Sequence, residues 1–245
     1  MAGSHVMDGA LLAIFLATAF AGGIVTGLAG FAMGLVVSGV WLHILTPLQT
    51  TALICGFGLL VQLYGMWKLR RSFNWRHVTP LVAGSTIGVP LGVWLLAYVN
   101  PSYLRLGVGL LLILYSIDGL LRPAVKGVPA NVPVEVGVGF LNGVLGGMTG
   151  LTGVFVTVWC SMRGWSKDVQ RSVYQPVILA GFMVTLVSLT ATGSITVDII
   201  RLFLYGLPFL GAGMAIGLMI YGRLSDRTFR KVILILLLIS GTVLM

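Results

Sequence analysis

Charged residues are scarce in this chain, and so are the side chains that carry most enzyme chemistry. Lys, Arg, Asp and Glu together make up 9% of the 245 residues, with six acidic residues, two cysteines and three histidines. A soluble domain has about 25% charged residues, so the composition excludes an ordinary soluble protein. The apolar segments contain no Ser–His pair and no His, Cys, Asp or Glu set at metal-ligand spacing. We therefore predict no catalytic residue, no metal site and no cofactor.

Hydrophobic residues, in contrast, are abundant. They make up 58% of the chain, and the mean hydropathy is +1.04. Both values predict an all-α polytopic membrane protein surrounded by a lipid bilayer. The net charge of +9 does not indicate a nucleic-acid partner, because the basic residues lie almost wholly in short loops between apolar segments, where the positive-inside rule places them.

Eight apolar segments are separated by short polar or proline-containing turns. They cover residues 11–45, 52–67, 78–99, 103–121, 134–161, 173–189, 199–221 and 232–245. The first is 35 residues long, whereas a single span needs about 20 residues. Glycines crowd the middle of segments 11–45 and 134–161, which predicts a break in the helix there.

These two glycine-rich segments follow one pattern. The glycines at 23, 27, 30 and 34 have the same spacing as those at 139, 143, 146 and 150, at an offset of 116 residues. Farther along, the Gly-x-x-x-Gly at 88–92 corresponds to that at 213–217, at an offset of 125. We therefore expect a first transmembrane repeat at 9–122, a linker at 123–133 and a second repeat at 134–245. Internal repeats of this kind are typical of secondary transporters.

The basic residues distinguish two topologies. If all eight segments cross the bilayer, the two sides carry seven and eight Lys and Arg residues, and the positive-inside rule favours neither orientation. If segments 11–45 and 134–161 are instead re-entrant hairpins of two half-helices, each of about 15 residues, thirteen basic residues lie on one side and only Arg105 and Arg201 on the other. This split favours two inverted repeats, each a re-entrant helical hairpin plus three transmembrane helices. Eight ordinary spans are the alternative.

Two opposed hairpin tips, near 27–34 and 146–153, predict a binding site for a small anion. The first N–H groups of a helix have no partner within it, and the helix dipole adds positive charge there. Two such ends aimed at one point bind an anion without a buried Lys or Arg. The substrate-binding residues that we predict come from both tips and from two glutamines in other spans: Gly30, Phe31, Met33, Gly34, Gly146, Gly147, Met148, Thr149, Gly150, Thr152, Gly153, Gln175 and Gln62.

Structural interpretations of the same residues remain open. Glycine clusters in membrane helices also serve close helix packing. The Thr149 and Thr152 hydroxyls can each donate to a carbonyl one turn earlier in their own helix. A glutamine in a span needs polar partners whether or not a ligand is near.

The paired glycine motifs resemble the two signatures of the TauE/SafE family of sulfite and sulfonate exporters. The second motif, Gly139-Phe-Leu-Asn-Gly143-Val-Leu-Gly146-Gly147-Met-Thr-Gly150-Leu-Thr-Gly153, is the more specific, and the first runs from Gly23 to Gly34. The resemblance covers nearly the whole chain. It implies a multi-pass protein of the bacterial inner membrane that exports sulfite or an organosulfonate such as sulfoacetate.

The leading hypothesis is a secondary carrier for a small sulfur-containing anion, with alternating access through rocking of the two inverted halves. The alternatives are an anion channel that shares the site, or a carrier of another small oxyanion or carboxylate. The expected partners are the anionic substrate and the bilayer, and a homodimer is left open.

Overall fold

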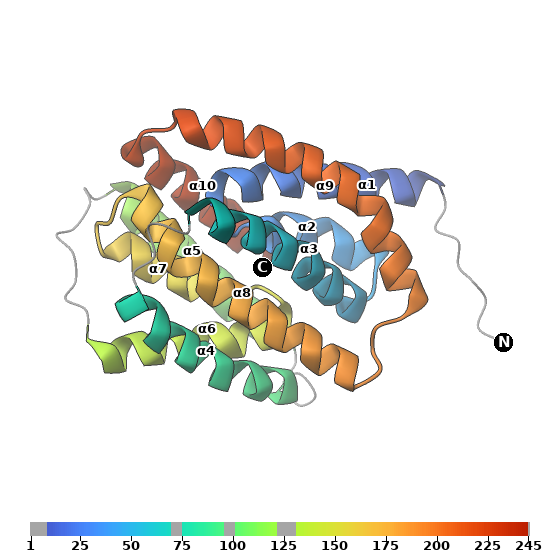
Figure 1. Ribbon diagram of the computed structural model, residues 1–245, viewed down its shortest axis with the longest axis horizontal. Helices are drawn as coiled ribbons and strands as arrows, with labels where there is room; N and C mark the ends of the chain where they lie inside the picture. Colours follow the sequence, from blue (N-terminus) through green and yellow to red (C-terminus); the bar gives the residue numbers. More distant parts are fainter. Residues whose placement is uncertain (1–8, 70–74, 96–100, 122–130, 245) are drawn as a thin grey trace.

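The computed structural model describes residues 9–69, 75–95, 101–121 and 131–244. These residues form ten α-helices and no β-strand (Figure 1). In chain order the helices are α1 (Gly9–Ala29), α2 (Met33–Ile44), α3 (Pro47–Leu69), α4 (Trp75–Leu95), α5 (Pro101–Leu121), α6 (Val132–Thr149), α7 (Val154–Met162), α8 (Lys167–Ala191), α9 (Val197–Arg223) and α10 (Asp226–Leu244). Most of the expected linker at 123–133 lies outside the described residues.

Both long apolar segments are broken where the glycines predicted a break. The first forms α1 and α2, separated by residues 30–32, and the second forms α6 and α7, separated by residues 150–153. Each longer helix ends at a glycine with a positive φ, +85° at Gly30 and +71° at Gly150. The half-helices are unequal, with 21 and 12 residues in the first pair and 18 and 9 in the second. The expectation of equal half-helices is therefore wrong.

The first broken segment folds back on itself as a helical hairpin. Trp41, near the end of α2, stacks on Phe15 near the start of α1 with ring centroids 4.7 Å apart. The Trp41 indole N–H also donates to the Thr18 hydroxyl at 2.6 Å. Because residues near the two outer ends touch, α2 runs antiparallel to α1, and the break at residues 30–32 is the tip of the hairpin (Figure 1).

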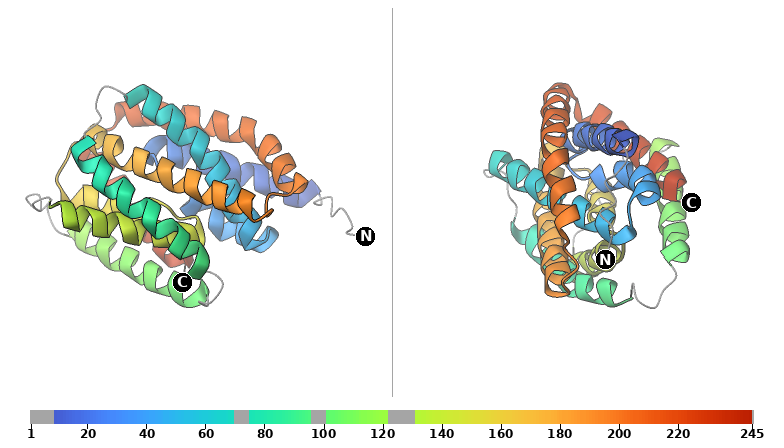
Figure 2. Two further views of the ribbon diagram at one scale, coloured as in Figure 1. Left: turned by 60° about the horizontal axis from the view of Figure 1, so that its bottom comes forward. Right: turned by 90° about the vertical axis from the view of Figure 1, so that its right-hand side faces the viewer.

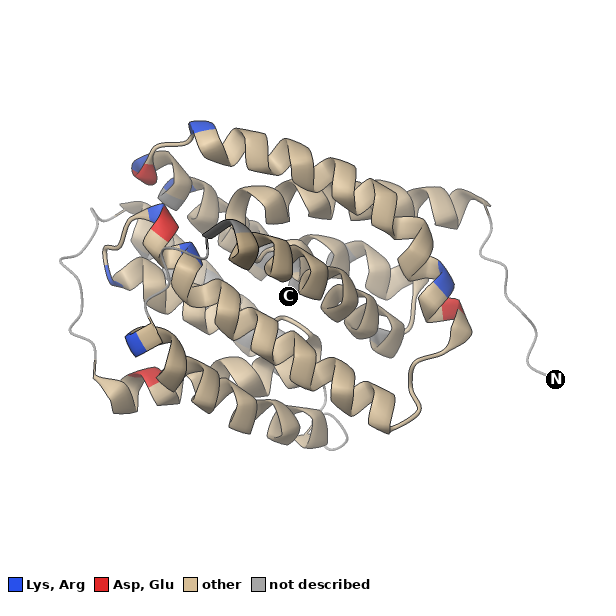
Figure 3. Cartoon of the chain, viewed as in Figure 1, with Lys and Arg blue, Asp and Glu red and all other residues tan. Residues whose placement is uncertain are grey.

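Six of the described helices are long and apolar enough to cross a membrane: α1, α3 over residues 48–67, α4, α6, α8 and α9. The chain is therefore a multi-pass membrane protein. Lys and Arg positions gather at one end of the bundle, where α4, α8 and α10 begin and α9 ends, whereas α9 begins at the opposite end (Figure 3). We call the first of these the basic end. Among the described residues, the charge separation follows the expected one.

Glycines bring α4 and α6 into backbone contact. A Cβ built on Gly143 of α6 would overlap the carbonyl of Ser85 on α4, and one built on Gly88 of α4 would overlap the carbonyl of Phe140 on α6. Only the absence of a side chain allows helices to approach so closely, and the close approach strengthens their van der Waals contact in lipid. We call this contact the α4–α6 seam; the two helices lie side by side in both views of Figure 2.

A second seam, between α1 and α9, is built in the same way. Gly23 of α1 lies 120 residues before Gly143, and its Cβ would meet the Leu210 carbonyl of α9, 125 residues after Ser85. The other corresponding pairs are Gly27–Met214 with Gly147–Val89, and Gly213–Phe20 with Gly88–Phe140. Each seam thus joins the broken segment of one half of the chain to a helix of the other half.

These contacts correct the register of the repeat. The sequence pattern aligns Gly30 with Gly146, at an offset of 116, whereas the structure pairs Gly30 with Gly150. Both end their helix with a positive φ, and both donate the N–H to a carbonyl four residues earlier, of Thr26 and of Gly146 respectively. The error is one helical turn, because glycines that recur every three or four residues match again after a shift of four. The contacts of the later glycines, Gly213 with Phe20 and Gly88 with Phe140, agree with an offset of 125 between Gly88 and Gly213.

Replacing Gly143 by alanine is expected to lower the melting temperature of the detergent-purified protein. The added methyl group would push the α4 and α6 backbones apart, and overpacking of this kind costs typically about 1–3 kcal/mol. Gly137 on the same helix is the matched control, since nothing lies within 4 Å of a Cβ built there. Gly137→Ala should be neutral or slightly stabilising, through the higher helix propensity of alanine. Equal melting temperatures for the two variants would contradict the seam.

Candidate functional site

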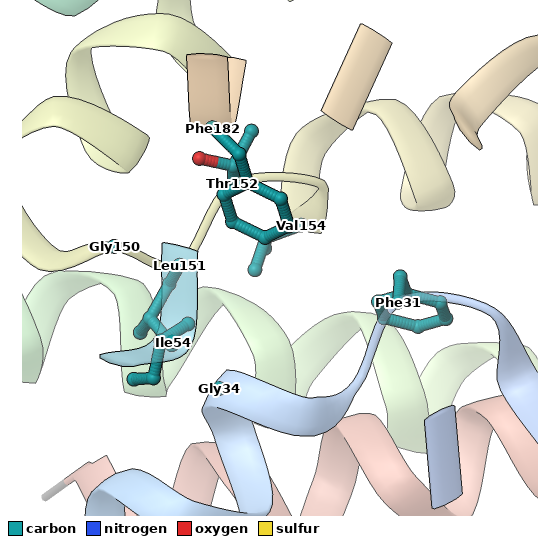
Figure 4. Close-up of a pocket in the computed structure, with 8 residues that line it drawn as sticks. All are labelled: Phe31, Gly34, Ile54, Gly150, Leu151, Thr152, Val154 and Phe182. Carbon is teal, nitrogen blue, oxygen red and sulfur yellow. The ribbon is translucent and has the colours of Figure 1, made fainter. Parts of the chain in front are cut away.

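The two breaks meet at one small cavity. Residues of both breaks, of α3 and of α8 line it: Phe31, Gly34, Ile54, Gly150, Leu151, Thr152, Val154 and Phe182 (Figure 4). The breaks are in contact there, since a Cβ built on Gly34 would lie 3.2 Å from Leu151 Cδ2. The space open to the centre of a water-sized sphere is about 10 Å³, which is the room that one water molecule needs. In this conformation the cavity is too small for a larger solute.

The N-termini of α2 and α7 border this cavity. The residues that precede them, Ala32 and Gly153, make no side-chain capping hydrogen bond. Gly34 and Val154, in the first turns, line the cavity. The first N–H groups of both helices have no intrahelical partner, and the positive ends of both helix dipoles lie at the same place. Such an arrangement favours a small ligand that is negatively charged and accepts hydrogen bonds.

The second break is stabilised by left-handed glycines and a buried asparagine. Gly150 and Gly153 have φ values of +71° and +113°, which other residues adopt only with strain. The Gly153 N–H donates to Oδ1 of Asn142 on α6 at 2.9 Å, and Asn142 is fully buried. Thr149 donates its hydroxyl to the Leu145 carbonyl at 2.8 Å. The structural interpretation of Thr149 is therefore confirmed.

Thr152 behaves differently from Thr149. It lines the cavity, it is buried, and its hydroxyl has no hydrogen-bond partner. The oxygen faces α6 beside Gly146, whose missing side chain leaves room for it. The back-bonding interpretation is therefore wrong for Thr152.

The first break is stabilised by side chains that bind the carbonyls at the end of α1. The hydrogen bonds are Gln62 Nε2 to Gly30 O (2.9 Å), Tyr174 hydroxyl to Ala29 O (2.5 Å) and the Arg171 guanidinium to Gly27 O (3.3 Å). The last carbonyls of a helix have no partner within it, and in apolar surroundings each unsatisfied group is costly. At this break the carbonyls are bound by side chains, whereas Ala32, which precedes α2, makes no side-chain capping hydrogen bond.

Arg171 is a residue of this site that sequence reasoning missed. The expected span begins at residue 173, but α8 begins at Lys167, so Arg171 lies in its second turn and only 3% of its surface is exposed. A Cβ built on Gly30 would lie 2.9 Å from the Arg171 Nε. A buried arginine that the sequence did not predict therefore lies beside the first break, although it does not line the cavity. The available signal was spacing, because Arg171, Gln175 and Ile178 recur at helical intervals on one face.

Several predicted residues support the breaks but do not line the cavity. Met33 packs back onto α1, Gly147 belongs to the α4–α6 seam, and Gly146 makes room for Thr152. Met148 is buried outside the cavity lining. For Gly146 and Gly147 the close-packing interpretation holds.

Gln175 lies in the interface between α8 and α3. It is fully buried, and neither its amide nitrogen nor its amide oxygen has a hydrogen-bond partner. Its amide packs against Gly65 of α3, 2.5 Å from a Cβ built there. The structure therefore places Gln175 among buried polar atoms near the first break, and not at the cavity wall.

Of the apolar residues in the cavity wall, Phe31 was predicted and most of the others were not. Ile54, Leu151 and Phe182 line it, but in a chain this hydrophobic no periodicity separates the inward face of a span from the lipid face. Within the described residues, no group of three or more His, Cys, Asp or Glu residues could hold a metal ion.

A family model described as Sulfite exporter TauE/SafE matches residues 14–244. Because the match covers nearly the whole chain, this chain belongs to the TauE/SafE family. No curated protein and no solved structure matches it. Membership implies a membrane exporter of the sulfite or sulfonate type. It agrees with the expectation that the chain is not an enzyme.

Replacing Asn142 by leucine is expected to destabilise the protein by about 1–3 kcal/mol, because the Gly153 N–H would be left buried without an acceptor. Asn131 is the matched control: it precedes the same helix, is exposed and makes no side-chain capping bond. Thermal unfolding in detergent should show a lower melting temperature for Asn142→Leu than for Asn131→Leu. If Asn142→Leu melts like the wild type, the asparagine does not hold the second break.

Proposed function

We propose that this member of the family is a secondary transporter that exports a small sulfur-containing anion, sulfite or an organosulfonate such as sulfoacetate. The anion binds between the starts of α2 and α7. The observation that carries the proposal is the convergence on one cavity of two helix N-termini whose preceding residues make no side-chain capping bond. Such ends supply hydrogen-bond donors and partial positive charge, which an oxyanion accepts.

The proposal includes two inverted repeats whose broken segments re-enter the side from which they came. The exchange of partners between the two seams supports the repeat, since α1 packs on α9 as α6 packs on α4. The gathering of Lys and Arg at the basic end supports the inversion (Figure 3), because the positive-inside rule places that end in the cytoplasm. We place the protein in the bacterial inner membrane.

The small size of the cavity favours a carrier over a channel. A channel needs a continuous wet path, whereas the space at the breaks is about 10 Å³, which holds about one water molecule. Binding therefore requires α2 and α7 to move apart. The moving bodies differ from the two sequence halves, because each seam holds a broken segment of one half to a helix of the other. We expect α1 to move with α9, and α6 to move with α4.

Replacing Gly34 by leucine is expected to abolish sulfite transport. Gly34 lines the cavity, and a Cβ there would already lie 3.1 Å from Ile54 and 3.2 Å from Leu151. A leucine would fill the space between the breaks and cover the first N–H groups of α2. Proteoliposome assays should show at least a tenfold lower rate of sulfite transport, and sulfite should no longer raise the melting temperature.

Gly107→Leu is the control for this experiment. Gly107 is also a helical glycine, but it is exposed on α5 with nothing within 4 Å of a built Cβ. Gly107→Leu should transport sulfite at the wild-type rate. In a separate comparison, sulfite should raise the melting temperature of the wild-type protein more than chloride does. Wild-type transport by Gly34→Leu would rule out the cavity as the anion site.

Cysteine labelling tests the inverted topology. Single cysteines at Leu48 and Arg227, both exposed, should react with a membrane-impermeant reagent from opposite sides. When the segment α6–α7 is re-entrant, five crossings separate the two positions: α3, α4, α5, α8 and α9. Eight ordinary spans would place both on the same side. The native Cys55 and Cys160 are buried and can be replaced by alanine to remove background.

A further inference from the structure

Arg171 carries a buried positive charge that forms no salt bridge within the described part of the chain. The guanidinium donates one hydrogen bond to the Gly27 carbonyl and lies 4.2 Å from the centre of the Tyr221 ring. Its Nε–H has no hydrogen-bond partner, and among the described residues no carboxylate oxygen lies within 4.0 Å of it. Burial of a charge without an oppositely charged partner is strongly unfavourable. Packing alone therefore does not explain why an arginine occupies this position.

The second break shows that the fold does not need this charge. Gly150 corresponds to Gly30, and the residue that corresponds to Arg171, 120 positions earlier, is Thr51. A Cβ built on Gly150 would lie 3.3 Å from the Thr51 methyl group, just as one built on Gly30 would lie beside Arg171. One break is therefore stabilised beside a threonine, and the other carries a cation in the same place. The charge is an addition to the shared architecture.

Other buried polar atoms without partners lie near Arg171. Both amide atoms of Gln175, one turn along α8, and Oε1 of Gln62, which bonds to the first break through Nε2, have none. Together with the Nε–H of Arg171 they offer N–H donors to the oxygens of an anion and amide oxygens to any hydroxyl that it carries. We call these three side chains the Arg171 cluster.

Aromatic rings separate the Arg171 cluster from the cavity. Phe31 lines the cavity and packs edge-on against Tyr174, with ring centroids 5.7 Å apart. On its other side the cluster faces the basic end, where Lys167 lies 4.7 Å from the Tyr221 ring centre and the Tyr221 hydroxyl donates to Asp168. The cluster thus lies between the basic end and the cavity.

We infer that the Arg171 cluster is a capture station for the anion on its way from the basic end to the cavity. An oxyanion docks on the Arg171 Nε–H and the Gln175 amide, and then passes Phe31 to reach the starts of α2 and α7. A guanidinium suits this role because it binds oxyanions with directed hydrogen bonds and keeps its charge at all physiological pH values. The inference rests on the proposed function for the identity of the ligand class.

The test measures sulfite binding and sided transport for Arg171→Gln. Glutamine keeps an amide donor for the Gly27 carbonyl and removes the charge. The dissociation constant for sulfite should rise at least tenfold, and KM should rise for sulfite supplied at the basic end of oriented proteoliposomes. Arg223→Gln is the matched control, since it removes one exposed charge from the same end; its values should stay within twofold of the wild type.

A purely structural arginine gives a different result. Arg171→Gln would then lower the melting temperature of the anion-free protein but leave its sulfite affinity and KM unchanged, and that outcome would overturn the inference. If Arg171→Gln does not fold, Arg171→Lys keeps the charge and loses the directed Nε–H. It should show a rise in KM of several-fold, and an unchanged KM would again overturn the inference.

The same variants separate this inference from the proposed site. If Gly34→Leu is inactive while Arg171→Gln binds and transports like the wild type, the cavity is supported as the anion site and the capture role of the Arg171 cluster is ruled out. If Gly34→Leu transports normally while Arg171→Gln loses sulfite binding, the Arg171 cluster is supported as an anion site and the cavity is ruled out as one.

Discussion

A helix that breaks inside lipid leaves backbone groups without partners, and this constraint shapes the whole site. At the first break, side chains of α3 and α8 bind the carbonyls that end α1. At the second, Asn142 accepts the Gly153 N–H. The residues that precede α2 and α7, Ala32 and Gly153, make no side-chain capping hydrogen bond. Since unsatisfied polar groups are costly in a membrane, the groups left open are donors that a bound anion can satisfy.

Glycine serves two purposes in this chain, and the backbone conformation tells them apart. At Gly30 and Gly150 a positive φ ends a helix. At Gly23 and Gly143 the backbone is helical, and the missing side chain lets another helix touch it. The seams hold the longer half-helices in place, so that the breaks at their ends meet at one cavity. The two interpretations of the glycines, close helix packing and formation of a binding site, are therefore compatible, because the close packing places the breaks next to each other.

The sequence predicts the helices, the two breaks and the family, because each depends on local composition: apolar runs, glycine clusters and a motif. It does not predict the register of the first glycines, since a shift of one helical turn keeps most matches. It also misses Arg171, because Lys167 and Asp168 make the start of α8 resemble a loop. Of the residues predicted to bind substrate, Gln62 donates to the Gly30 carbonyl at the first break, and Gly147 contacts α4. Which face of an apolar helix points inward is a property of packing, and composition does not record it.

The difference between the two breaks gives the site a direction. The repeat supplies two equivalent turns, but Arg171 and Gln62 lie at the first where Thr51 and Phe182 lie at the second. A symmetric pair of helix ends binds an anion equally well from either side, because the dipoles oppose each other. A fixed charge next to only one break lowers the energy of the anion on that side alone. The charged break faces the basic end. In the proposed topology that end is cytoplasmic, so under that proposal the asymmetry would favour loading of the anion from the cytoplasm.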